Sequence, residues 1–144
     1  MQLGIRSKDK AGNYSQPVYN QISIDTELPN LPTFVDPQCQ AMNGVTQGLC
    51  KDVNFTWTGA FDSGSGLKLY EYYWGQDPNG TSPSAQLLAG VIHLDPDPVN
   101  DGSVTYLRMR VQDNLEKWSE WQTLFTLRFD SRFTNFLFLP TIHK

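Results

Sequence analysis

Histidine and cysteine are scarce in this chain, with two of each among 144 residues, and this limits the chemistry that the protein can carry. His93 and His143 stand alone, and no serine or cysteine lies in a nucleophile context such as G-x-S-x-G. Carboxylates are plentiful, but none lies in an apolar segment that would raise its pKa. We therefore expect no catalytic residues and a protein that is not an enzyme.

Long apolar runs and excess positive charge are also missing. The longest uninterrupted apolar stretch is FLFLP at 136–140, which is far too short to span a membrane. The net charge is −4, and the lysines and arginines are scattered, so we expect neither a nucleic acid nor an anionic membrane as partner. No segment of helical length places apolar residues three and four apart, which argues against helices.

Period-two alternation is what the sequence does contain, and it predicts half-buried antiparallel strands. It is clearest at 53–58, 67–75, 106–113 and 121–130. In the third of these, Leu107 and Met109 are predicted to face the core, and Arg108 and Arg110 to face water. The fourth places Trp121 on the same face as Phe125. The chain is thus predicted to be all-β.

The end of the chain repeats its beginning. Residues 3–15, LGIRSKDKAGNYS, align with residues 107–119, LRMRVQDNLEKWS. A period near one hundred residues corresponds to one β-sandwich module. We expect residues 1–25 to be the terminal hairpin of a preceding repeat, 26–130 a complete sandwich and 131–144 a C-terminal tail. Pro29 and Pro32 are expected to stiffen the connector between the first two parts.

Cys39 and Cys50 enclose a loop rich in glycine, asparagine and glutamine. The spacing favours a disulfide, with free thiols as the alternative; a zinc site is disfavoured because no histidine is nearby. A disulfide would stabilise the chain by roughly 2–3 kcal/mol and would indicate an oxidising, extracellular location.

Three aspartates are predicted to meet at one pole of the sandwich: Asp25 on the incoming connector, Asp62 in one loop and Asp113 in a later turn. Carboxylate oxygens from three segments could bind Ca²⁺ and stiffen the joint between modules. The alternative is that each aspartate caps its own turn, because the regular spacing of a calcium loop is absent.

Two tyrosines lie out of phase with the core-facing residues of their strands, Tyr73 and Tyr106. Exposed planar rings can stack on the faces of sugars, so they are candidate ligand-binding residues. The alternative is cross-strand packing on the outer face of the sheet.

The segments 55–67 (FTWTGAFDSGSGL), 70–75 (YEYYWG) and 106–121 (YLRMRVQDNLEKWSEW) resemble fibronectin type III or bacterial immunoglobulin-like modules of tandem arrays in secreted and surface proteins. The resemblance implies a two-sheet antiparallel sandwich preceded by an orphan hairpin. It also implies a non-catalytic spacer or adhesion module of an extracellular bacterial protein, whose partners are neighbouring modules, and a carbohydrate or another surface protein as possible ligand. The alternative function is a carbohydrate-binding accessory module of a secreted hydrolase.

The resemblance has one departure. The family commonly has glycine where the second copy has Glu116, and Gly12 stands there in the first copy. If the turn needs a positive φ, Glu116 costs about 1 kcal/mol; the alternative is that the turn has changed type.

Overall fold

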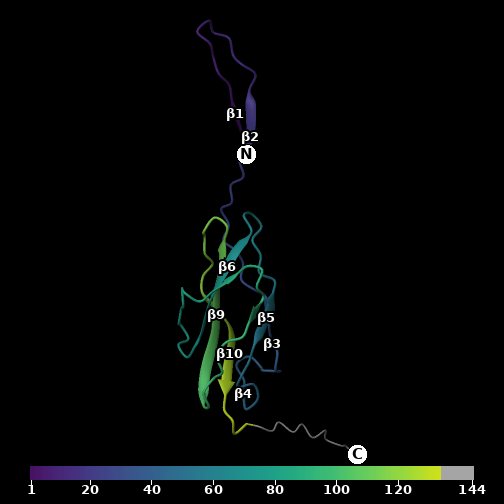
Figure 1. Ribbon diagram of the computed structural model, residues 1–144, viewed down its shortest axis with the longest axis vertical. Coiled ribbons are helices and arrows are strands. Elements are labelled where there is room, and N and C mark those ends of the chain that lie inside the picture. Colours follow the sequence, from purple (N-terminus) through teal and green to yellow (C-terminus); the bar gives the residue numbers. More distant parts are fainter. Residues whose placement is uncertain (134–144) are drawn as a thin grey trace, which may run out of the picture.

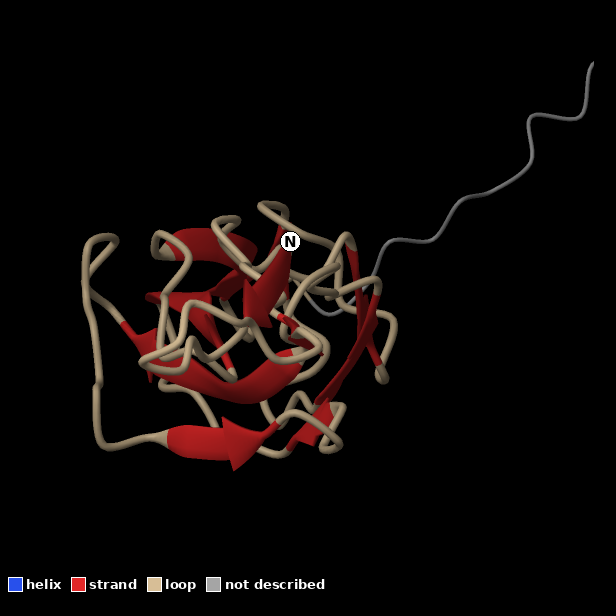
Figure 2. Ribbon diagram, turned by 90° about the horizontal axis from the view of Figure 1, so that it is seen from above, coloured by secondary structure: helices blue, strands red, loops and turns tan. Residues whose placement is uncertain are grey.

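The computed structural model describes residues 1–133, and these form strands, turns and loops without a helix (Figures 1 and 2). A C-terminal tail is predicted at 131–144; its residues from 134 onward, including FLFLP, lie outside the described residues. No helix long and apolar enough to cross a membrane occurs in residues 1–133.

Ten strands form three sheets. The five-stranded sheet has the order β4-β10-β9-β6-β7, made of Thr46–Gln47, Gln122–Phe129, Ser103–Asp113, Leu67–Gly75 and Gln86–Leu88. The three-stranded sheet has the order β3-β5-β8, made of Phe34–Pro37, Phe55–Thr58 and His93–Leu94. A hairpin of β1 (Gln2–Ile5) and β2 (Val18–Gln21) forms the third sheet. The pairing is antiparallel except between β4 and β10, which run parallel over two residues.

The core lies between the two larger sheets, as the alternation predicts. Phe55 on β5 packs edge-to-face on Trp74 of β6 and Phe125 of β10, with ring centroids 5.5 and 5.2 Å apart. Trp57 packs in the same way on Tyr70. Aliphatic residues of β9 and β10 are buried in the same cluster, together with Val53, which precedes β5. The all-β sandwich prediction is confirmed.

The outer face of the five-stranded sheet is not open to water. Arg108, predicted to face solvent, is 9% exposed, and Glu71, opposite Arg110 on β6, is 2% exposed. Arg108 donates to the carbonyls of Gly80 and Trp121. A polar layer therefore covers this face, because the segments that follow β6 and β9 fold back over it.

A β-bulge explains the misplaced Trp121. The register of β10 on β9 shifts between Thr123 and Phe125, which inserts one extra residue and reverses the alternation. Trp121 consequently stacks on Arg110 of the outer face, with 5.3 Å from the guanidinium carbon to the ring centroid, while Phe125 remains in the core. The prediction that both rings share one face is wrong.

The β1–β2 hairpin extends from one end of the sandwich, beyond the connector (Figure 1). Among the described residues, its hydrogen bonds all lie within residues 1–22. Pro29 and Pro32 are buried against the sandwich, and Asn30 already pairs with Phe61. The connector between the hairpin and the first contacts of the 29–32 segment thus consists of residues 23–28.

Candidate functional site

The sequence repeat is a structural repeat of one tight turn. In the hairpin, Asn13 N donates to Asp9 Oδ1 at 2.8 Å; after β9, Lys117 N donates to Asp113 Oδ1 at the same distance. Each aspartate therefore closes a turn through its own carboxylate, as the capping alternative predicts.

The rest of the two turns matches as well. Arg6 stacks on Tyr14 with 4.0 Å from guanidinium carbon to ring centroid, and Arg110 stacks on Trp118 at 4.1 Å. The equivalent serines accept a backbone N–H at 3.0 and 2.9 Å. Gly12 has φ +95°, and Glu116 adopts φ +68° at the equivalent position. Of the two alternatives that the sequence leaves open at Glu116, the structure has the positive φ with the turn retained.

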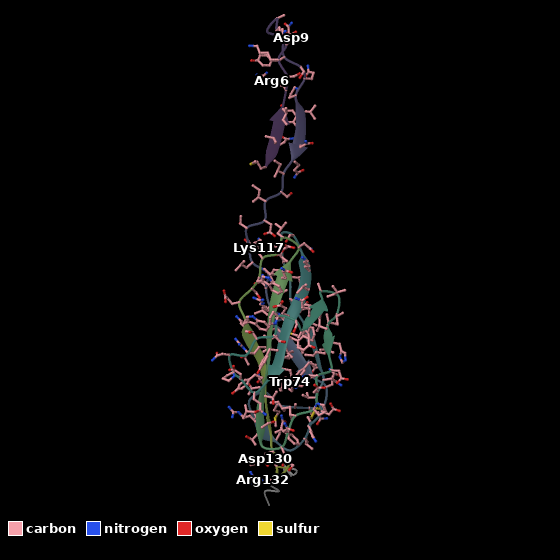
Figure 3. All side chains as sticks on the ribbon, turned by 60° about the vertical axis from the view of Figure 1, so that its left-hand side comes forward. Arg6, Asp9, Trp74, Lys117, Asp130 and Arg132 are labelled. Carbon is pink, nitrogen blue, oxygen red and sulfur yellow. A yellow bond between two sulfur atoms is a disulfide. The ribbon has the colours of Figure 1, made fainter. Side chains whose placement is uncertain are left out.

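The three predicted aspartates meet where the connector reaches the sandwich. One carboxylate oxygen from each of Asp25, Asp62 and Asp113 lies within 4.8 Å of the other two. The connector, the turn after β5 and the turn after β9 thus converge at the end of the molecule that faces the hairpin, where Figure 3 labels Lys117.

Each aspartate also holds a piece of backbone. Asp62 Oδ2 accepts from the N–H groups of Ser65 and Gly66, at 2.8 and 2.7 Å. Asp25 accepts from Ser65 N through Oδ2 and from Glu27 N through Oδ1. The turn at 62–66 fits closely around Asp25, since a Cβ placed on Gly64 would lie 2.2 Å from Asp25 Cγ.

Two carboxylate oxygens of the cluster are not used in this way. Asp113 is fully buried, and its Oδ2 accepts no hydrogen bond; the same is true of the buried Oδ1 of Asp62. The predicted alternatives, turn capping and convergence, are therefore both present.

Lys117 supplies the cation that sequence reasoning missed. Its Nζ lies 3.3 Å from Asp25 Oδ1 and 3.4 Å from Asp113 Oδ2, and it donates to the backbone carbonyls of Asp25 and Glu27. The signal was available in the repeat: the first copy has Asn13 at this position, so the two copies of the turn differ in charge here.

The pKa shifts follow from these contacts. A side-chain hydrogen bond with Ser65 is the largest cause that lowers the pKa of Asp25; partial burial opposes it, and Glu27 N and Lys117 add to it. Partial burial by itself would lower the pKa of Lys117, but its contacts and charge interactions with Asp25 and Asp113 outweigh it and raise that pKa. Both groups are therefore held in their charged forms.

Tyr73 and Tyr106 lie on the same outer face, since Tyr73 is opposite Arg108 and Tyr106 is opposite Gly75. Both are half-buried. The Tyr73 hydroxyl accepts from Asp77 N at 3.1 Å, and a Cβ on Gly80 would lie 2.2 Å from its ring. Tyr73 is thus packed on the adjacent loop in addition to lying on the sheet.

Tyr73 also lines a groove at the side of the sandwich, whereas Tyr106 does not. This shallow groove of about 340 Å³ is lined by Tyr72, Tyr73, Trp74, Asp95 and Asp97, among others. Trp74 Nε1 donates to the Asp97 carbonyl at 3.0 Å, which fixes the ring at the edge of the groove. Sequence reasoning assigned Trp74 to the core alone, yet this half-buried ring contacts both the core and the groove.

Cys39 and Cys50 form the predicted disulfide. Both half-cystines pack against the core cluster, so the loop that they close, which carries β4, is tied to the sandwich.

No protein-family model matches the chain, and no curated protein matches it significantly.

Proposed function

We propose that the chain is a non-catalytic spacer or adhesion module of an extracellular, multi-module bacterial protein, in which the cluster of Asp25, Asp62, Asp113 and Lys117 fixes the joint between one module and the next. The observation that carries the proposal is the way in which the connector is held. Lys117 forms an ion pair with Asp25 and donates hydrogen bonds to the backbone carbonyls of Asp25 and Glu27, and Ser65 N in the 62–66 turn donates to Asp25. A spacer needs such a joint because a free linker would let neighbouring modules reorient.

The repeat supports the multi-module part of the proposal. Leu3 and Ile5 of the hairpin are 44% and 61% exposed, whereas their counterparts Leu107 and Met109 are fully buried beneath the second sheet. A hairpin with the same turn and with apolar residues at the same positions fits a sandwich of the same kind, in which those residues would be covered. The disulfide is compatible with an oxidising, extracellular setting.

The joint is tested by ¹⁵N relaxation on the whole chain. We expect the amides of β1 and β2 to report the same overall tumbling as those of β9 in the wild type, and faster independent motion in Lys117→Met. Lys10→Met, an exposed lysine at the hairpin tip, is the matched control and should behave as the wild type. Independent tumbling of the wild-type hairpin would refute the proposed joint.

A carbohydrate-binding accessory module is the second candidate, and the groove at Trp74 is the observation that favours it. An aromatic ring beside the carboxylates of Asp95 and Asp97 offers both a stacking surface and hydrogen-bond acceptors for sugar hydroxyls. Polysaccharide pull-down should then succeed and should weaken in Asp95→Ala but not in Asp52→Ala, which changes an exposed aspartate outside the groove. Uniformly absent binding would favour the spacer.

A further inference from the structure

The cluster at the joint has properties that turn capping and the lysine do not account for. We propose that Asp25, Asp62 and Asp113 form a binding site for Ca²⁺, and that the Lys117 ammonium and the ion compete for the same oxygens. The inference rests on the proposed role of this cluster as a joint, and it adds the ligand that would regulate the stiffness of that joint.

The unpaired oxygens are the first observation. A buried carboxylate oxygen without a donor is costly, because burial removes the water that would otherwise solvate it. Asp113 has no exposed surface, and its Oδ2 accepts no hydrogen bond; its nearest cation, Lys117 Nζ, lies at 3.4 Å, beyond ordinary hydrogen-bond distance. The buried Oδ1 of Asp62 also has no partner. Asp62 Oδ1 is therefore available to a ligand that accepts electron pairs, and Asp113 Oδ2 becomes available when its ion pair with Lys117 is broken.

The charge balance is the second observation. Three carboxylates meet one ammonium in the cluster, which leaves two negative charges uncompensated there. The other ion pairs of the described residues lie elsewhere, so no second protein cation reaches the three aspartates. A divalent cation would supply the missing charge, whereas a further monovalent one would supply half of it.

The ligand chemistry favours calcium among the divalent ions. Carboxylate and carbonyl oxygens are hard ligands, and Ca²⁺ binds them at about 2.3–2.6 Å in flexible geometry. One oxygen from each of the three aspartates lies within 4.8 Å of the other two, so a single ion can contact all three. Mg²⁺ demands near-octahedral geometry at about 2.0–2.1 Å, which three separate segments supply less readily.

The Lys117 ammonium occupies oxygens that calcium would use, so the two cations exchange at this site. Its ammonium takes the backbone carbonyls of Asp25 and Glu27, which are hard oxygen ligands of the kind that calcium prefers. The ion and the ammonium repel each other at this distance, so calcium binding requires the flexible lysine side chain to swing out. Removal of the lysine charge should therefore strengthen calcium binding, a result that simple loss of an ion pair would not give.

The test is calorimetric titration of the whole chain with CaCl₂ to about 10 mM, roughly tenfold above the weakest affinities of extracellular calcium sites. We expect saturable binding by the wild type and about tenfold tighter binding by Lys117→Met, with MgCl₂ binding more weakly to both. Asp62→Asn should abolish binding, since it removes a charge while its side-chain oxygen can still accept from Ser65 N and Gly66 N. Asp9→Asn is the matched control and should bind as the wild type, because Asp9 closes the equivalent turn without the other two carboxylates.

Three results would overturn the inference: no saturable heat from either the wild type or Lys117→Met, weaker binding by Lys117→Met than by the wild type, or an equal loss in Asp9→Asn and Asp62→Asn. Near-ultraviolet circular dichroism checks that each variant is folded before titration. The proposal of a joint and the proposal of an ion site can be refuted independently. Calcium binding with an independently tumbling hairpin would refute the joint alone, and a rigid hairpin without calcium binding would refute the ion site alone.

Discussion

Arg110→Met should destabilise the sandwich, because it leaves the buried charge of Glu71 without its partner. Glu71 is 2% exposed, and its Oε2 accepts from Arg110 Nε at 2.7 Å and lies 2.7 Å from the second guanidinium nitrogen. After the substitution, the carboxylate retains one described donor, Gln86 Nε2 at 2.9 Å.

The magnitude follows from the burial of the two partners. Removal of one member of a fully buried pair costs about 3–5 kcal/mol. Arg110 is 26% exposed, so solvent screening reduces this cost to roughly 2–3 kcal/mol. Loss of the stacking on Trp118 adds about 0.5–1 kcal/mol. We expect a total loss of about 3 kcal/mol in the free energy of unfolding, a large part of the 5–15 kcal/mol typical of a domain.

Urea denaturation of the disulfide-bonded chain, followed by tryptophan fluorescence, measures this loss. The second variant is Glu71→Gln in the Arg110→Met background, which removes the uncompensated charge and keeps an acceptor for Gln86. It should recover about 2 kcal/mol of the loss, since replacing both members of a buried pair costs far less than breaking it. A loss below about 1 kcal/mol in Arg110→Met, with no recovery in the double variant, would show that water solvates Glu71 and would refute the reasoning.

Three further predictions concern the disulfide, the left-handed turn residue and the pH range of the joint. Replacing the Cys39–Cys50 disulfide by two serines should lower the free energy of unfolding by about 3 kcal/mol, from the entropy of closing so short a loop; an unchanged urea midpoint would contradict this. Glu116→Gly should raise the free energy of unfolding by roughly 0.5 kcal/mol. The substitution relieves about 1 kcal/mol of left-handed backbone strain, and the loss of a weak, exposed ion pair with Lys68 offsets part of this gain. Destabilisation would show that the strain is absent. The stability of the joint should depend on pH at both extremes. The pKa of Asp25 is lowered in the folded state, so its contribution is complete above pH 3.8 and is lost as the pH falls through the folded-state pKa. The pKa of Lys117 is raised, so its contribution is complete below pH 10.5 and is lost as the pH rises through the folded-state pKa. Relaxation of the hairpin amides should therefore stay constant from about pH 5 to pH 9 and change outside that range; a change near pH 7 would implicate another group.

The local pattern of the sequence determined the fold class and much of the site. Alternation placed Phe55, Trp57, Leu107 and Met109 in the core, since the side chains of a strand point to opposite faces with a period of two. The internal repeat located the turn of Asp113 and the left-handed position of Glu116, because a turn is specified by a few consecutive residues. Topology then predicted that Asp25, Asp62 and Asp113 would meet, and their oxygens do converge.

Other features depend on contacts between segments that are distant in the sequence, and no local pattern predicted them. The bulge before Phe125 moved Trp121 to the outer face, and no residue in that strand marks where the extra one is inserted. Arg108 and Glu71 carry charges that predict exposure, yet segments distant in sequence cover them and provide their partners. Lys117 is an example at the site. Local sequence determines its position in the turn, but its ammonium contacts a carboxylate and two carbonyls of the connector, about ninety residues earlier in the chain. A charge is compensated by whatever the fold brings within a few ångströms, and that is a property of the packed chain rather than of any window of its sequence.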